Sequence, residues 1–486
     1  MDYPIKESAF RMHSRIGLLC IALAFGLSSC SMAPSVTAPE SRLPESFDAD
    51  GVDFSEDVSA KYWWRAFGDA QLNALIDTAL VVNLDLEMAA SRVLEVQQAH
   101  RITRAAQLPG IQAGVDGSRQ NTPTNTGPTG RFAGSIPGFP DRFDVTSYSA
   151  SLTLGYELDI WGKARASSKA ALSNWIGVQA DYRAIRMGII AEVIATYFEI
   201  RDQEHLFAAI EQQVDLLEER QELTAVRYER GLASSFELYA IQQSFDELRT
   251  QAPLVEASLF DAQSRLGILL GRTPGEVMGL ITEGVFSLPA LPQLPDMLPS
   301  ELIRSRPDVM AAEASMEAAR QMIGVRRAEQ FPSFSLTASG GTQSNTLGDL
   351  AQTSQKFWLF GGSLTAPVFA AGARRAAVKV AWAQYEQAAL AYEKAILTAF
   401  RDVSAALVLL SAEQQRYSAS QSSLNAAGAS LDLMNRRFAR GVGDYGSLID
   451  SELNHLRAAT AMTTAQRSNT LARLTLYRAI GGKWVE

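Results

Sequence analysis

Two hydrophobic patterns divide the chain, one with a period of two residues and one with alternating steps of four and three. The clearest stretch of period two runs from Ser147 to Leu158. Its apolar positions share one face: Tyr148, Ala150, Leu152, Leu154, Tyr156 and Leu158. This period predicts a β-strand. Weaker alternation at 111–115 and 334–338 predicts two more strands, and Phe357–Phe369 is the fourth candidate.

The second pattern predicts two very long helices, Lys163–Arg230 and Ala373–Arg440. Each would span about 100 Å at about 1.5 Å per residue. Two seams with four-three spacing predict coiled-coil packing: Val378, Trp382, Tyr385, Ala389, Tyr392, Ile396, Ala399, Val403, Ala406 and Leu410, and Ile241, Phe245, Leu248, Ala252, Val255, Leu259, Ala262, Leu266 and Leu269. Pro253 interrupts the second seam and predicts a kink or a local break.

The chain repeats itself. Asn83–Val115 matches Arg306–Ala338, and RYERG at Arg227–Gly231 recurs as RFARG at Arg437–Gly441. Repeats of this length indicate a duplicated half. We therefore expect a signal peptide (1–29), a lipidated linker and equatorial segment (30–60), a first repeat with helix, two strands, long helix and return helix (61–270), a Pro-rich connector (271–300), a second repeat (301–482) and a C-terminal tail (483–486).

Each long helix is predicted to turn back at a glycine, Gly231 or Gly441. Ser234 with Glu237 forms a capping-box pattern that begins the first return helix. In the second copy, Asp444 stands at the position of Ser234, after Gly443. The string GVGDYG matches GxGxxG, but it joins two helices and follows no strand, so it does not predict a dinucleotide site.

Strands of about 10 residues with one apolar face are typical of a barrel that crosses a membrane around water. A soluble sandwich would show the same alternation. After the N-terminus no continuous apolar run reaches the roughly 18 residues of a spanning helix. Four strands cannot close a pore, and a membrane excludes open sheet edges, so several chains must share one barrel. We expect outward-facing loops at Arg119–Thr146 and Thr342–Gln355.

The N-terminus resembles a bacterial lipoprotein signal: Arg11 and Arg15 precede an apolar run that ends in Leu-Ser-Ser-Cys30. The resemblance implies cleavage before Cys30, acylation of that cysteine (palmitate among the acyl groups) and, because Ser31 follows, sorting to the outer membrane. An ordinary signal peptide with an incidental cysteine is the alternative. Cys20 would be removed, so the mature chain has no disulfide. Met12 is an alternative start.

The composition and the motif content mainly exclude classes of function. Of the 486 residues, 47% are hydrophobic and 20% charged, and the net charge of −9 argues against nucleic acid as a partner. The four histidines are scattered without metal-ligand spacing. No GxSxG, Walker A or HExxH motif occurs. We therefore expect no enzyme activity, no catalytic residue, no metal site and no cofactor.

Four motifs, in order, resemble those of one family: WWRAFGD with LNALIDTAL from Trp63, LGYELDIWGKAR at Leu154–Arg165, RPDVMAAEASMEAARQMIGVRRAEQFPSFSL at Arg306–Leu336, and APVFAAGARRAA at Ala366–Ala377. From about Trp63 onward the chain resembles the outer membrane factor family, the TolC- and OprM-like, NodT-type outer membrane efflux lipoproteins. The resemblance implies a mixed α and β membrane protein. Four transmembrane β-strands per chain would share a trimeric twelve-stranded barrel, continued by a long α-helical coiled-coil periplasmic barrel.

The same resemblance implies that the turns at Gly231 and Gly441 are periplasmic tips that open when partners dock. Three copies of Asp444 would form a carboxylate ring that favours cations. The alternative role for Asp444 is a helix N-cap, which is compatible with the ring. Tyr445, Arg437 and Arg440 are candidates for contacts that hold the tips shut, although Arg440 could instead cap its helix.

We therefore expect the outer membrane channel subunit of a tripartite efflux system. It would be a homotrimer anchored in outer membrane lipid through Cys30, with a large periplasmic extension, and a passive duct for an RND-type inner membrane transporter and a periplasmic adaptor. Two alternatives remain at this stage: the exit duct of a type I protein secretion system, and a surface-anchored coiled-coil structural protein. The sequence does not identify the exported solute.

Overall fold

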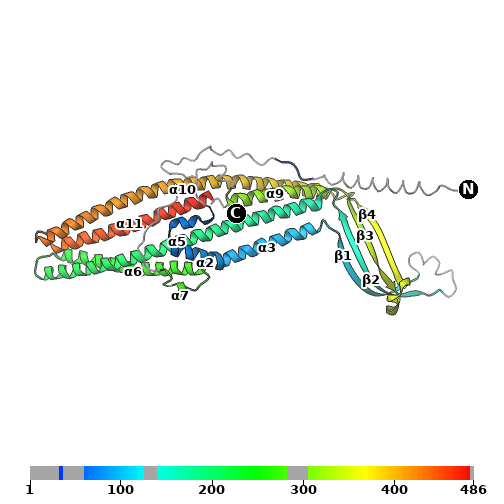
Figure 1. Cartoon of the computed structure of the whole chain (residues 1–486), viewed down its shortest axis with the longest axis horizontal. Coiled ribbons are helices and arrows are strands. Elements are labelled where there is room, and N and C mark those ends of the chain that lie inside the picture. The colour runs from blue at the N-terminus through cyan, green and yellow to red at the C-terminus, as the bar shows by residue number, and fades with distance from the viewer. Residues whose placement is uncertain (1–31, 37–59, 125–138, 278, 282–304, 482–486) are drawn as a thin grey trace. The chain divides into compact units, whose positions relative to one another are not determined.

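The computed structural model describes the chain except residues 1–31, 37–59, 125–138, 278, 282–304 and 482–486 (Figure 1). Two units can be distinguished. The strand unit comprises Met1–Ala38, Glu95–Trp175 and Ala314–Ala389, and the helical unit comprises Pro39–Leu94, Ile176–Glu313 and Leu390–Glu486. Several helices pass from one unit into the other, among them α5 and α10.

Four antiparallel strands make one sheet in the order β1-β2-β3-β4 (Figure 1). They are β1 (Gly110–Pro123), β2 (Arg142–Leu158), β3 (Ser333–Ser344) and β4 (Lys356–Thr365). The four predicted strands are thus confirmed. Their register aligns one apolar row across the sheet, because Ile111 faces Leu154, Leu154 faces Ala338, and Ala338 faces Phe360. The two edge residues of this row are exposed, 68% for Ile111 and 69% for Phe360, whereas Leu154 and Ala338 in the middle are half-buried. Exposed apolar side chains are expected of a surface that meets lipid.

Three predicted strand boundaries were wrong: the end of β1, the start of β2 and the end of β4. The expected loop Arg119–Thr146 is shorter, because β1 and β2 continue into it. Arg119 Nη2 lies 2.6 Å from Asp144 Oδ2 across the two strands, and such cross-strand pairs stabilise a sheet even where the sequence is polar. The middle of this loop lies outside the described residues. β4 ends at Thr365 and not at Phe369, because Pro367 cannot donate a backbone hydrogen bond.

The second expected loop, Thr342–Gln355, is partly ordered. Its first residues, to Ser344, belong to β3. Two short 3-10 helices follow, η3 (Leu347–Ala351) and η4 (Thr353–Gln355). The loop therefore begins three residues after the predicted start at Thr342, and it ends where predicted, at β4.

The helices follow the predicted duplication. The first copy contains η1 (Ala60–Phe67), α2 (Ala70–Val82), α3 (Leu84–Ala105), α5 (Lys163–Glu229) and α6 (Ser235–Leu269), and the short helix α7 (Pro274–Val277) lies in the predicted connector. The second copy contains α9 (Pro307–Ala328), α10 (Ala373–Ala439) and α11 (Tyr445–Ile480). The two long helices α5 and α10 each have 67 residues, within one residue of the predicted ends.

Both predicted seams face the interior of the protein. Every seam residue of α10 and α6 is buried or half-buried, as coiled-coil packing requires. The predicted break at Pro253 does not occur, since α6 continues through it as one helix. The exposed position explains the tolerance: the carbonyl that loses its donor belongs to Arg249, and both Arg249 and Pro253 are exposed, so water can take the place of the missing amide.

The largest core lies in the helical unit, where η1 and α2 pack on the long helices. Trp64 is fully buried, and the Trp63 ring stacks on Tyr477 with centroids 5.4 Å apart. Asp69 caps α2 and also accepts a 2.7 Å hydrogen bond from the Tyr197 hydroxyl. The N-terminal aromatic run therefore fastens the start of the first copy to α5 and α11.

One described helix, α10, contains an 18-residue window apolar enough to cross a membrane, with a mean hydropathy of 1.6. This property rests on length and composition alone. One third of the window is buried inside the protein, where α10 contributes to the core. A single such helix is weak support for a membrane span, because the core helix of a soluble protein passes the same test.

Candidate functional site at the helix turns

The two turns that reverse the long helices have the same backbone geometry. Gly231 (φ 69°) and Gly441 (φ 71°) adopt the left-handed conformation. The amide of Gly231 donates to the Tyr228 carbonyl, and the next amide donates to the Arg227 carbonyl. Gly441 and Val442 repeat these two bonds onto Phe438 and Arg437. Both turns are therefore Schellman motifs, which require a residue without a side chain at the reversal.

Each return helix begins with the predicted cap. Ser234 and Glu237 form a complete capping box at the start of α6. Asp444 caps α11 by accepting from the Ser447 amide (3.0 Å) and the Ser447 hydroxyl (2.5 Å). These bonds hold the pKa of the exposed Asp444 carboxyl below its ordinary value of 3.8, because they stabilise the charged form. The cap role is thus observed, and the carboxylate stays ionised at neutral pH.

Two contacts next to Asp444 join the two copies. The Tyr445 hydroxyl donates to Glu219 of α5, and its ring lies 5.4 Å from Phe438. One helical turn further on, Arg220 of α5 donates to Asp450 of α11 at 3.3 Å. The α5–α6 hairpin is therefore tied to the α10–α11 hairpin close to both turns.

Gly446 makes room for this ion pair. A methyl group at Gly446 would overlap the Arg220 guanidinium, since its carbon would lie 1.4 Å from Nη1. Nε and Nη1 of Arg220 have no hydrogen-bond partner among the described atoms. The arginine thus lies against the start of α11, and among the described residues Asp450 is the partner of its guanidinium.

The predicted contacts of Arg437 and Arg440 are not seen within one chain. Both side chains are exposed, and among the described residues neither guanidinium has an ion-pair partner. The Arg437 carbonyl instead accepts from Val442 and from Gly443. Sequence reasoning missed Glu219 and Arg220, which precede the first turn by about three helical turns. The signal that the sequence offered for these two residues was their charge on a helix face, and that face meets the second hairpin in the structure.

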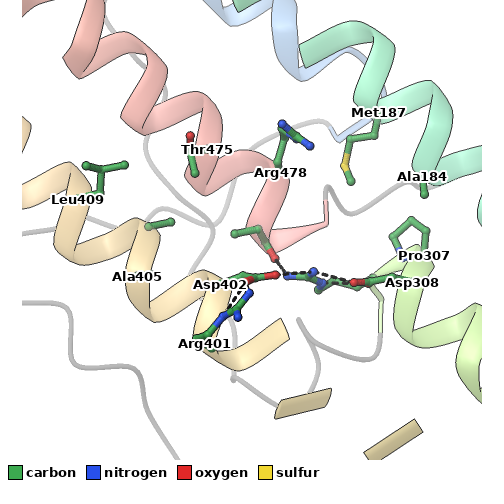
Figure 2. Close-up of a pocket in the computed structure, with 13 residues that line it drawn as sticks. Ala184, Met187, Pro307, Asp308, Arg401, Asp402, Ala405, Leu409, Thr475 and Arg478 are labelled. Atoms are coloured by element: carbon green, nitrogen blue, oxygen red, sulfur yellow. Dashed lines mark hydrogen bonds and ion pairs between the residues drawn. The ribbon is translucent and has the colours of Figure 1, made fainter. Parts of the chain in front are cut away.

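A second cluster lies in the helical unit, around the beginning of α9 (Figure 2). A cavity of about 650 Å³ is lined by residues of α5, α9, α10 and α11. At its wall the buried Arg306 binds both oxygens of Asp308 (2.7 and 3.0 Å), Asp402 (3.2 Å) and the Ala479 carbonyl (2.8 Å). These pairs raise the pKa of Arg306 against the opposing effect of burial. The arginine therefore ties three helices together.

The remaining predicted site, Cys30, lies outside the described residues. The described chain resumes at Met32, against α9. Among the residues that the structure describes, no three His, Cys, Asp or Glu side chains are grouped as metal ligands. The turns thus offer an ionised carboxylate and hydrogen-bonding groups at the exposed ends of the hairpins.

Comparison with known proteins identifies the family. The family model for outer membrane efflux protein matches residues 75–272 and 298–482. ArpC of Pseudomonas putida, an antibiotic efflux pump outer membrane protein, is 31% identical over 96% of both chains. CusC of Escherichia coli, a cation efflux system protein, is 29% identical over 96% of this chain and 98% of that protein.

The structure gives the same result. The open-state MtrE outer membrane channel of Neisseria gonorrhoeae superposes with a TM-score of 0.78 at 28% identity, over 93% of this chain and 98% of that chain. This likeness confirms the predicted fold class, a membrane protein in which four strands per chain are continued by long helices. Together with the family match over most of its length, it shows that the chain belongs to the outer membrane efflux protein family.

Proposed function

We propose that this chain is the passive exit duct of a tripartite efflux system, and that three copies form one channel. The observation that carries the proposal is the four-stranded sheet with two unpaired edges, β1 and β4. A membrane excludes open edges, and a closed barrel needs about eight strands or more. Three chains would supply the twelve strands expected from the sequence.

We propose further that Cys30 carries the lipid anchor and that the hairpin turns are the periplasmic tips. At the tips, Asp444 from three chains would form an acidic ring, which favours cations through Coulomb attraction. The Tyr445–Glu219 and Arg220–Asp450 contacts support a latched resting tip, since both join the two hairpins of one chain. Arg437 and Arg440 are free to contact a neighbouring chain in that state.

The proposed partners are a periplasmic adaptor and an inner membrane transporter of RND type, which supply the energy that this chain lacks. Relatives named for antibiotic, toluene and cation efflux have similar identity to this chain. This similarity supports a duct that does not select the solute. The efflux names also favour this function over an exit duct for secreted proteins or a structural stalk.

The first test is the native mass of the detergent-purified protein, followed by conductance in planar bilayers. We expect a trimer with cation-selective conductance, and Asp444→Asn should reduce the selectivity. Asp432→Asn is the matched control, because that acid lies on α10 beside Arg436 and about three turns before the tip. A stable monomer would contradict the shared barrel. A trimer whose selectivity responds equally to both changes would contradict the ring alone.

A further inference from the structure

The short segment 32–36, which follows Cys30 almost directly, lies on α9. Arg327 Nη1 donates to the Met32 carbonyl at 3.2 Å, and Arg320 Nη1 donates to the Pro34 carbonyl at 2.5 Å. All of these residues belong to the strand unit. The segment would otherwise have no partners for its carbonyls, because it forms no helix or strand.

Gly324 lies between the two arginines on the same face of α9. The spacing of four and three residues from Arg320 through Gly324 to Arg327 places the three in one row along the helix. A Cβ atom at Gly324 would lie 2.8 Å from the Ala33 nitrogen and 3.2 Å from the Ala33 Cβ. The backbone of α9 and the segment are therefore in direct contact, and a side chain at 324 fits only if the segment moves outward by a few tenths of an ångström.

The two guanidinium groups are positioned before they meet the segment. Glu317 accepts from Arg320 through both carboxylate oxygens (2.6 and 2.7 Å), and Gln321 donates to the same carboxylate. Arg327 lies over the Trp382 ring of α10, 5.4 Å from its centroid. Side chains held in this way lose less conformational freedom when they bind, so their hydrogen bonds contribute more of their energy.

We propose that Arg320, Gly324 and Arg327 form a binding site for the extended peptide that follows the acylated cysteine, and that this tether clamp fixes the height of the lipid anchor relative to the sheet. The proposal rests on the lipidation of Cys30 proposed above. Recognition is through backbone carbonyls, so it tolerates most side chains in the segment. Ala33 is the exception, since it needs a small side chain opposite Gly324.

The position of the clamp supports its proposed role in fixing the height of the lipid anchor relative to the sheet. Only Ser31 separates Cys30 from Met32, so the anchor lies within about 7 Å of the clamped backbone. At the other end, Arg327 lies six residues before Ser333, where β3 begins. A free tether would allow many distances between lipid and strands. The clamp restricts the distance between the lipid and the strands to a single value, with the tether held next to the base of the sheet.

A disulfide across the contact tests the clamp. In the double variant Ala33→Cys and Gly324→Cys, the two Cβ atoms would start 3.2 Å apart, a few tenths of an ångström closer than in ordinary disulfides. The mature chain has no other unacylated cysteine, so free thiols can be counted with a maleimide after denaturation. We expect a disulfide in most chains once dissolved oxygen, with copper–phenanthroline as catalyst, has taken up the two electrons and two protons that the thiols lose. Adding Arg320→Gln and Arg327→Gln should slow its formation about tenfold or more, since each lost bond has a charged donor.

The control pairs Ala33→Cys with Ser315→Cys. Ser315 is exposed on α9, about 13 Å from Gly324 along the axis and on the opposite face, so no disulfide should form. Free thiols in both pairs would overturn the clamp. The intact mass of the same sample reports acylation separately. An acylated chain without the disulfide refutes the clamp alone, whereas a cross-linked chain without acyl groups refutes the anchor at Cys30.

Discussion

Replacing Arg306 by methionine removes the guanidinium at the junction of α9, α10 and α11 but keeps most of the apolar stem. Arg306 is 8% exposed, whereas the side chains of Asp308 and Asp402 are 48% and 31% exposed. Breaking a fully buried ion pair costs about 3–5 kcal/mol. Because water will reach both carboxylates here, the cost of leaving them without the arginine is smaller than that. The Ala479 carbonyl loses its donor, which adds about 1–3 kcal/mol. We therefore expect a loss of about 3 kcal/mol per chain.

Thermal unfolding in detergent measures this loss. At about 2.1 cal/mol/K per residue, the unfolding entropy of a chain of this length is about 1 kcal/mol/K, so Tm should fall by about 3 °C. Arg401→Met is the control, because Arg401 binds the same Asp402 at 2.6 Å with a side chain 74% exposed. An exposed pair contributes at most about 1 kcal/mol, and Tm should fall by less than about 1 °C. Equal shifts for the two variants at one scan rate would refute the assignment of Arg306 as the tie.

Two further predictions concern the tips. Gly446→Ala should displace Arg220 and loosen its pair with Asp450, so a cysteine probe at the turn should react faster with a maleimide. The control Gly428→Ala, whose new methyl group would make only ordinary contacts, should leave the reaction rate unchanged. Equal rates for the two variants would contradict the latch. Ser447→Ala removes the bonds that lower the pKa of Asp444. The stabilisation from these bonds is present above the ordinary pKa and disappears as pH falls through the lowered one. Cation selectivity should therefore be lost at a higher pH in Ser447→Ala than in the unmodified channel, and identical pH profiles would argue against a role for the carboxylate.

Much of the candidate site could be read from local sequence. Glycine at 231 and 441 marked the reversals because a Schellman turn needs a positive φ, and Ser234 and Asp444 marked the caps because their oxygens accept from amides three residues on. The ends of β1 and β2 could not be read in this way. Polar strand residues such as Arg119 and Asp144 have no local signal, and only their cross-strand partner keeps them in the sheet.

Local sequence patterns were enough to predict the repeated order of elements, the four strands, the apolar face of each strand and the length of α5 and α10, because period, glycine and capping residues act within a few positions of the chain. Which faces meet follows from the packing of distant segments. Arg220 and Asp450 are 230 residues apart, and Arg320 and Pro34 are 286 apart. Such pairs depend on how one helix is rotated and shifted against another segment. The rotation and shift are set by the packing of complete helix faces against each other, so a local pattern of residues does not predict them.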